Sequence, residues 1–525
     1  MAAILRAVLS MSAINALSRV TGYARAMVMA AVLGTGVVAN AYNASNGIAN
    51  LLYELFLGGI LYSTFVPLLV ERMTNHGEED ARRFTNALLT LFLPFLAAVA
   101  FVGIVFAGPL VDLATSFTGS ERLSPEEAQE TTELSVFFFR FFVLYIFFFG
   151  LGSVLTGVLN AHRHFILPTI GPVLNNLFAV ACLGGYALLA PKNPEAALYL
   201  LAITTFGVAT MALILLPTAW RLGYGTRPVF GHPALLPAVK LAIPVLVFTA
   251  GSIGVQYVSL LLGTNFAAVP QLYLAFTVFS LPYGVFIIAL ETALMPELSE
   301  RHARGDIEGY RDTLSFGLRT MAFMMVPASV GLIALATPTI GLLYERGEFT
   351  SEDTDLVASL LVAYSVGLLA YSAYFLLVRA FYSRQSPKIP ALLNIVFFVF
   401  YAALAYILSH VVGVIGVALA LSGANAVFAL ACLAAMRREI RRLGARRLLR
   451  SLGKILVAGA VMYAVAHFGL MLLGDGSNAL ERLGILAVVG GASLAAYLGV
   501  ALLLQAEELK SAVVLLRRRL AAEEG

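Results

Sequence analysis

The stretch Ala7–Met73 decides the fold: AVLSMSAINALSRVTGYARAMVMAAVLGTGVVANAYNASNGIANLLYELFLGGILYSTFVPLLVERM. Its apolar runs predict two membrane-length helices joined by a short uncharged turn. The first helix carries Arg19 and Arg25 at membrane depth, where a charge costs roughly 2.5–3.5 kcal/mol. Apolar sequence continues on both sides of them. We therefore expect a solvated intramembrane site that holds an anion; the alternative is that both side chains extend to the membrane interface.

Polar side chains follow one face of each of these two helices. In the second helix, four residues recur at i, i+3, i+7 and i+11, which is one helical face: Asn43, Asn46, Asn50 and Glu54. In the first helix, Arg25 shares a stripe with Ser18, whereas Arg19 lies about 120° away on a straight helix. These positions are the first candidate substrate-binding residues.

Composition places the whole chain in the membrane. Of 525 residues, 60% are hydrophobic and only 12% are charged, which excludes a soluble domain of this size. The fold class is an all-α polytopic membrane protein with about fourteen transmembrane helices. Basic residues gather in alternate loops and acidic residues in the opposite ones, so both termini are predicted to be cytoplasmic. The net charge is +4.

An internal repeat predicts two lobes. The pattern P-x-L-x-E-R occurs at 67–72 and again at 296–301, six spans later. Transporters whose halves repeat in parallel have this arrangement. The predicted divisions are an N-lobe (1–222), a linker (223–237), a C-lobe (238–436), a basic cytoplasmic loop (437–451), two added helices (452–504) and a cytoplasmic amphipathic tail (505–525).

The first two helices of the second lobe are also polar. Ser252 and Gln256 lie on one face of the seventh span, and Thr277, Ser280 and Glu291 on one face of the eighth. They predict a central cavity between the lobes, unless the hydroxyls and amides only bind helices together. Glu54 and Glu291 are candidates for coupling transport to an ion. Their alternative role is a protonated carboxyl packed against a neighbour.

Chemical motifs are missing. The sequence has no H-E-x-x-H, no Walker A loop and no cluster of metal ligands, so we expect a transporter rather than an enzyme, with no cofactor and no metal site. An ion gradient or the membrane potential would then drive it, with the ion unknown. The expected partners are membrane lipids rather than nucleic acid, because the basic loop adjoins the membrane.

Several motifs resemble the MurJ (MviN) lipid II flippases. They are Ser18-Arg19-x-x-Gly22-x-x-Arg25, Asn50-Leu-Leu, Phe65-Val-Pro67, Tyr344–Thr350 (YERGEFT) and Phe381–Lys388 (FYSRQSPK). The resemblance covers about four fifths of the chain and is similar to the branch from high-GC Gram-positive bacteria. It implies the multidrug/oligosaccharidyl-lipid/polysaccharide exporter fold, with the last two helices forming a groove for the lipid tail. It also implies a bacterial cytoplasmic membrane protein that moves lipid-linked peptidoglycan precursor outward by alternating access, beside cell-wall synthesis proteins.

The chain departs from the family at four charged positions. Ala26 and Asn40 stand where many members carry an acidic residue, and Glu54 and Thr277 where they carry cavity arginines. The exact substrate therefore stays open: the alternatives are another polyprenyl-pyrophosphate-linked saccharide, or a drug in a cation-coupled exporter. A membrane glycosyltransferase would need acidic residues in the loop 34–39, which has none.

Overall fold

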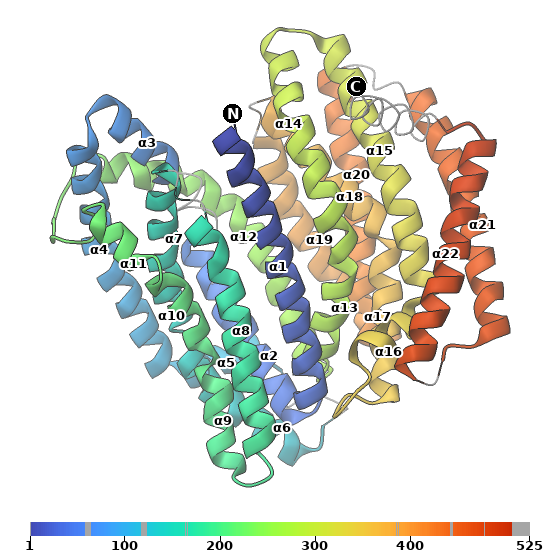
Figure 1. The fold of residues 1–525 in the computed structure, drawn as a ribbon, viewed down its shortest axis with the longest axis horizontal. Coiled ribbons are helices and arrows are strands. Elements are labelled where there is room, and N and C mark those ends of the chain that lie inside the picture. Colours follow the sequence, from blue (N-terminus) through green and yellow to red (C-terminus); the bar gives the residue numbers. More distant parts are fainter. Residues whose placement is uncertain are drawn as a thin grey trace. The chain divides into compact units, whose positions relative to one another are not determined.

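The structure is a computed structural model that describes residues 2–57, 65–116, 123–162, 164, 166–384, 386, 388–440, 445–476 and 478–506. The chain divides into two compact units (Figure 1). Unit 1 comprises Met1–Pro270 with Arg346–Phe349, and unit 2 comprises Gln271–Glu345 with Thr350–Gly525. Within the described residues, every regular element is a helix, as predicted.

Unit 1 contains the first twelve α-helices. They are α1 (Ala2–Leu33), α2 (Val37–Leu57), α3 (Val66–Asn75), α4 (Glu78–Val105), α5 (Ala107–Ala114), α6 (Pro125–Phe142), α7 (Tyr145–Ala161), α8 (Ile166–Leu189), α9 (Pro194–Ala202), α10 (Phe206–Leu213), α11 (Leu216–Arg221) and α12 (Leu235–Asn265). A 3₁₀ turn, η3 (Ile203–Thr205), joins α9 to α10. Their buried faces form one apolar core, with the stacked rings of Phe138 and Phe142 at its centre.

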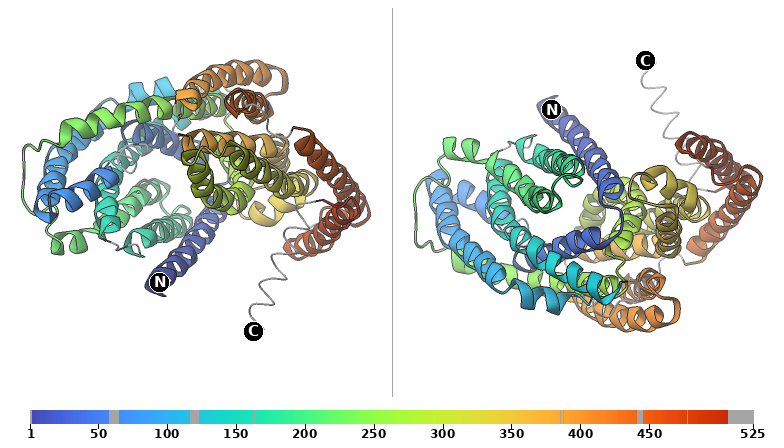
Figure 2. Two further views of the ribbon diagram at one scale, coloured as in Figure 1. Left: turned by 90° about the horizontal axis from the view of Figure 1, so that it is seen from above. Right: turned by 90° about the horizontal axis from the view of Figure 1, so that it is seen from below.

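Unit 2 contains the remaining helices. They are α13 (Val269–Pro282), the π-helical turn η4 (Tyr283–Ile287), α14 (Ile288–Ala303), α15 (Ile307–Ala334), α16 (Ala336–Tyr344), α17 (Ser351–Val366), α18 (Leu368–Ser383), α19 (Lys388–Val412), α20 (Ile415–Ile440), α21 (Ala445–Leu473) and α22 (Ala479–Leu503). The helices α21 and α22 run side by side in both views of Figure 2. They pack on α15, where a Cβ on Gly459 would lie 2.8 Å from Val326, so the glycine permits the close approach.

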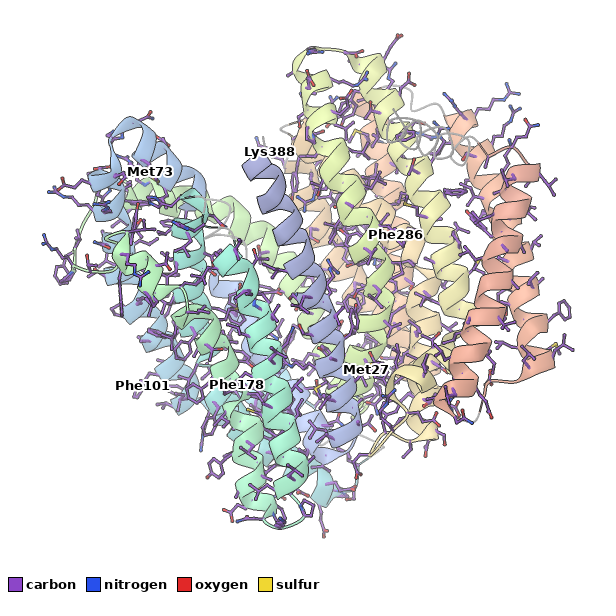
Figure 3. All side chains as sticks on the ribbon, in the orientation of Figure 1. Met27, Met73, Phe101, Phe178, Phe286 and Lys388 are labelled. Atoms are coloured by element: carbon purple, nitrogen blue, oxygen red, sulfur yellow. The ribbon has the colours of Figure 1, made fainter. Side chains whose placement is uncertain are left out.

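The surface of both units is apolar. Large hydrophobic side chains are exposed along the helices, among them Phe101 (67% exposed) and Phe286 (46%), labelled in Figure 3. Ten helical stretches are long and apolar enough to span a membrane, or eleven with the bent pair α17–α18, counting described residues alone. α1 and α2 are not among them, because their polar stripes reduce the mean hydropathy. The chain is a multi-pass membrane protein; the count of fourteen spans stays a prediction.

Several predicted spans are broken helices. The predicted tenth span is α17 and α18, which meet at a 47° bend. A Cβ on Gly367, the residue at the bend, would lie 2.5 Å from the Ser422 backbone, so α20 crosses there in close contact. The eighth span passes through the π turn η4 just after Pro282, whose missing N–H disturbs the regular ladder.

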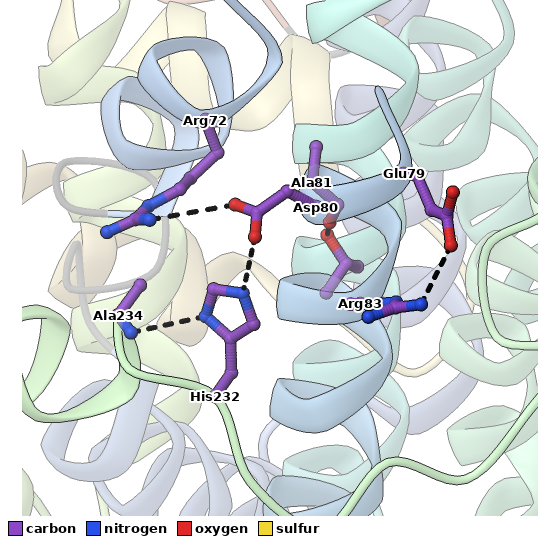
Figure 4. A network of polar contacts seen from close by, with 8 residues as sticks. Arg72, Glu79, Asp80, Ala81, Arg83, His232 and Ala234 are labelled. Atoms are coloured by element: carbon purple, nitrogen blue, oxygen red, sulfur yellow. Dashed lines mark hydrogen bonds and ion pairs between the residues drawn. The ribbon is translucent and has the colours of Figure 1, made fainter. Parts of the chain in front are cut away.

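The segment that precedes α12 is fixed by a polar network at the turn between α3 and α4 (Figure 4). His232 Nε2 lies 3.2 Å from Asp80 Oδ1, and its Nδ1 accepts the backbone N–H of Ala234. Since Nδ1 accepts, Nε2 carries the proton and donates to Asp80. Arg72 lies 3.6 Å from the other oxygen of Asp80. Charge pairing thus joins two helix ends and the loop in unit 1.

The predicted divisions of the chain differ from the two units in one respect. The prediction begins the C-lobe at 238, yet α12 packs on α2 within unit 1. Contact units and repeat-related lobes are different quantities, so the lobes stay a prediction. The predicted loop 437–451 is helical at both ends, in α20 and α21, and residues 441–444 lie outside the described part, as does the predicted tail from 507.

Candidate functional site

Arg25 is half-buried on α1 and faces the start of α7. Its guanidinium contacts the hydroxyl of Tyr145, which is also approached by the hydroxyl of Thr205. The Tyr145 ring stacks on Phe142 at an interplanar angle of 4°, which fixes the position of its hydroxyl. A phenolic oxygen accepts hydrogen bonds without supplying negative charge. The arginine therefore keeps its positive charge at this site.

The asparagine stripe of α2 continues from the same hydroxyl. Asn46 Nδ2 donates to Tyr145 at 3.5 Å, and Asn50 Nδ2 donates to Asn46 Oδ1 at 2.7 Å. Asn43 instead donates to the Ala39 carbonyl of its own helix at 2.8 Å. Two of the three predicted asparagines thus join Arg25 in one hydrogen-bonded chain.

Glu54 ends this stripe and meets α12. Gln256 Nε2 donates to Glu54 Oε2 at 2.7 Å, joining two residues that were predicted from separate helices. We expected Glu54 to pair with Arg19 or Arg25, and the partner that the structure describes is Gln256. Ser252 lies half-buried one helical turn before it.

Ser18 and Arg19 have different surroundings from Arg25. The Ser18 carbonyl accepts from Thr21 at 3.0 Å and from Asn176 of α8 at 3.2 Å. A Cβ on Gly22 would lie 3.5 Å from that amide. Arg19 is exposed, and α1 runs unbroken past it. The two arginines therefore do not converge on one partner.

Asn40, one of the departures from the family, has a structural role. It is buried; its Nδ2 donates to the Thr35 carbonyl at 2.8 Å, and its Oδ1 accepts from the Val269 N–H at 3.3 Å. A neutral amide can do both at once, whereas a carboxylate only accepts. Ala26 is buried in the apolar core of unit 1.

The candidates in unit 2 lie on α13 and α14. Thr277 donates to the Tyr273 carbonyl and Ser280 to the Thr277 carbonyl, so both hydroxyls bond within their own helix. Glu291 is buried and lies 3.6 Å from the Nε of Arg379 on α18. The unit-1 and unit-2 candidates are each described within their own unit.

The sequence analysis missed Tyr145, Asn176 and Arg379. Arg379 had a detectable signal, since it is a charge inside a predicted span. Tyr145 and Asn176 had none, because each lies over a hundred residues from its partner in α1 or α2 and meets it only in the fold. In the described residues, no group of three or more His, Cys, Asp or Glu side chains could bind a metal ion.

Solved structures define the class of fold. The chain is similar to "Lipid II flippase MurJ, inward closed conformation" with a TM-score of 0.74 and 22% identity, over 94% of this chain and 97% of that one. It is also similar to an inward-facing multidrug resistance MATE family transporter of the MOP superfamily, with a TM-score of 0.64 and 15% identity over 83% and 98% of the two chains. The fold is that of a MOP-type membrane transporter.

Sequence relatives are more specific. The family model "Lipid II flippase MurJ" matches residues 29–475. A probable lipid II flippase MurJ of Vibrio cholerae is 28% identical over 97% of this chain and 98% of its own length, and one of Rhizobium tropici is 28% identical over 93% and 92%. The chain belongs to the MurJ family of lipid II flippases.

Proposed function

We propose that this protein carries lipid II, the polyprenyl-pyrophosphate-linked peptidoglycan precursor, from the inner to the outer leaflet of the bacterial cytoplasmic membrane. The observation that carries the proposal is the family match over residues 29–475, which includes Asn43, Asn46, Asn50 and Glu54. Arg25 and its hydrogen-bonded neighbours supply the chemistry, because a pyrophosphate is an anion that binds arginine forks.

In this mechanism the pyrophosphate displaces neutral acceptors from Arg25. The phosphate oxygens take over the guanidinium donors that contact Tyr145, and each charge-assisted hydrogen bond contributes about 1.5–3 kcal/mol. Asn46 and Asn50 meet the sugars with their amides. The polyprenyl tail stays in lipid, along a groove for which residues 452–504 are the candidates. Alternating access of the two lobes then carries only the polar head across the membrane.

The direct test is rescue of a bacterium depleted of its own lipid II flippase. We expect the unmutated chain, confirmed in membranes by immunoblot, to restore growth and lipid II exposure at the outer surface. Rescue by a chain that leaves lipid II on the cytoplasmic side would contradict the proposal. Failure of a well-expressed chain would favour a flippase for a different polyprenyl-pyrophosphate-linked saccharide.

The proposed orientation places both termini in the cytoplasm, with the basic residues of 437–450 inside and the acidic region near Gln129 outside. Single cysteines at these two places test it, in a background where Cys182 and Cys432, both buried, are replaced by alanine. Impermeant thiol reagents should block the second site and spare the first. Equal labelling of both sites in intact cells would contradict this orientation.

We further propose that an ion gradient or the membrane potential drives the cycle, with Glu54 as one coupling group. A carboxylate inside a membrane span changes charge with protonation, and transporters use such groups in proton relays. Dissipating the proton gradient and the potential separately, in cells that depend on this chain, tests which one drives transport. Cell-wall synthesis proteins are its proposed partners.

A further inference from the structure

Glu291 is a buried carboxylate with incomplete compensation. Its side chain is 5% exposed, and Oε2 lies 3.6 Å from Arg379 Nε, beyond hydrogen-bonding distance. The other oxygen, Oε1, is fully buried and has no hydrogen-bond partner. The hydroxyl of Tyr283, in the π turn, is its polar neighbour. A buried carboxylate in this state is costly, and a proton removes that cost.

Arg379 is the exposed member of the pair. Its side chain is 59% exposed, although it lies inside the apolar helix α18. Five residues on, Arg384 forms a conventional ion pair: its Nε lies 2.9 Å from Glu439, and both side chains are largely buried. The contrast indicates that Arg384 is committed to its partner, whereas Arg379 is accessible to a second anion.

We propose that Arg379 binds the pyrophosphate group of the lipid-linked substrate, and that Glu291 holds it in reserve until the carboxylate takes up a proton. This rests on the transport function proposed above and adds a binding residue in unit 2. When Glu291 is ionised, its charge attracts the guanidinium and opposes an incoming phosphate. When it is protonated, the arginine presents its full charge to the ligand. The π turn η4 begins eight residues earlier, and such turns are frequent at functional sites.

The surroundings of Glu291 contain few other charged or titratable groups. The π turn supplies Tyr283, and α18 supplies Tyr371 and Arg379. On α15, the buried Arg319 donates to the Ser315 carbonyl of its own helix. The site therefore has one carboxylate and one facing arginine, and a proton on Glu291 changes its net charge from zero to plus one.

The test is binding of undecaprenyl pyrophosphate to the full chain in phosphatidylcholine nanodiscs at pH 5.5 and pH 8. We expect Glu291→Gln to bind about tenfold more tightly than the unmutated chain at pH 8 and equally at pH 5.5. Titration of the pyrophosphate is common to both proteins and cancels in this comparison. Arg379→Gln should weaken binding about tenfold at pH 5.5, the loss expected for one charge-assisted contact. Arg379→Lys, which keeps the charge, should lose less.

Two further variants keep the result interpretable. Glu291→Gln/Arg379→Gln leaves no uncompensated charge, so it should fold, and it should bind as weakly as Arg379→Gln at pH 5.5. The matched control Arg384→Gln/Glu439→Gln removes the neighbouring pair and should leave affinity and its pH dependence unchanged.

Three outcomes would overturn the inference. They are unmutated affinity in the Arg379 variants, a pH profile of Glu291→Gln that parallels the unmutated chain, and full competition by phosphatidylglycerol, which would make the site one for lipid headgroups. Any of these alongside normal rescue by the unmutated chain refutes the inference alone. Failure of the unmutated chain to bind lipid II or to rescue refutes the proposed function.

Discussion

Each unit holds an arginine inside a long apolar helix, and the two arginines have different partners. In unit 1, Arg25 contacts the neutral hydroxyl of Tyr145, which Asn46 also approaches. In unit 2, Arg379 faces the buried carboxylate of Glu291. A neutral partner orients a cation without reducing its charge, whereas a carboxylate cancels the charge until it is protonated. The comparison teaches that one intramembrane residue type serves as a constant anion site in unit 1 and a conditional one in unit 2.

The largest effect should come from removing the cations of unit 1. We expect Arg19→Ala/Arg25→Ala to abolish rescue, because each lost charge-assisted contact costs about 1.5–3 kcal/mol, or roughly tenfold per 1.4 kcal/mol. Arg25→Lys keeps the charge but loses the planar fork, so it should be impaired rather than inactive. Growth rescue at matched membrane levels is the measurement.

Arg140→Ala is the control for this experiment, since Arg140 is an exposed arginine of α6 outside the polar network. It should rescue as the unmutated chain does. Full rescue by the well-expressed double variant would show that unit 1 does not hold the anion, and the contrast between the units would fail.

A smaller effect is expected at the neutral partner. Tyr145→Phe keeps the ring that stacks on Phe142 and deletes the hydroxyl that orients Arg25 and Asn46. One neutral hydrogen bond contributes about 0.5–1.5 kcal/mol, so lipid II binding should weaken by less than about tenfold. Binding in nanodiscs at fixed pH measures it. Affinity as low as that of Arg25→Ala would mean that the hydroxyl contributes more than orientation.

Sequence reasoning succeeded where the signal is local. Helical periodicity placed Asn46, Asn50 and Glu54 on one face, and the structure joins the first two to each other. It failed where a contact depends on distant residues. The bend at Gly367 arises from contact with α20, and the Tyr145 hydroxyl reaches α2 only because aromatic stacking fixes its ring.

The same reasoning explains the motif at 344–350. Gly347 has φ +62°, and a Cβ there would lie 2.1 Å from the Ala31 carbonyl oxygen. The Glu348 N–H donates to that oxygen at 2.9 Å. The sequence displays the glycine, but only the fold shows that the end of α1 is what requires it.

Glu54 tests whether unit 1 also contains a switchable group. Glu54→Gln preserves an acceptor for Gln256 and removes the negative charge. We expect normal membrane levels and a several-fold slower flipping rate, about 1 kcal/mol, that depends less on the proton gradient or membrane potential. The exposed carboxylate Glu71 provides the control, Glu71→Gln. If Glu54→Gln fails to accumulate in membranes, Glu54 is structural and only unit 2 has a conditional site.

The smallest effect on transport is expected at an ion pair that stays closed. Glu345, after α16, accepts from Arg482 of α22 at 2.9 Å and from Thr354 at 2.9 Å. Burial alone would raise the pKa of the Glu345 carboxyl, but these hydrogen bonds and the charge of Arg482 outweigh it and lower the pKa below its ordinary value of 4.5. A depressed folded-state pKa gives stability that is present above the unfolded pKa and is lost as pH falls through the folded value.

Arg482→Ala should therefore lower the free energy of unfolding by about 1 kcal/mol at pH 7 and by progressively less below pH 4.5, with flipping unchanged. Thermal unfolding of the purified protein across this pH range measures the loss. Arg346→Ala, a change at a basic residue one position after Glu345 and outside this ion pair, is the control. A fall in transport equal to that of the Arg379 variants would show that closed and conditional ion pairs do not differ in function. The pair at 2.9 Å and the pair at 3.6 Å would then be equivalent, and the contrast drawn from their geometry would have no functional meaning.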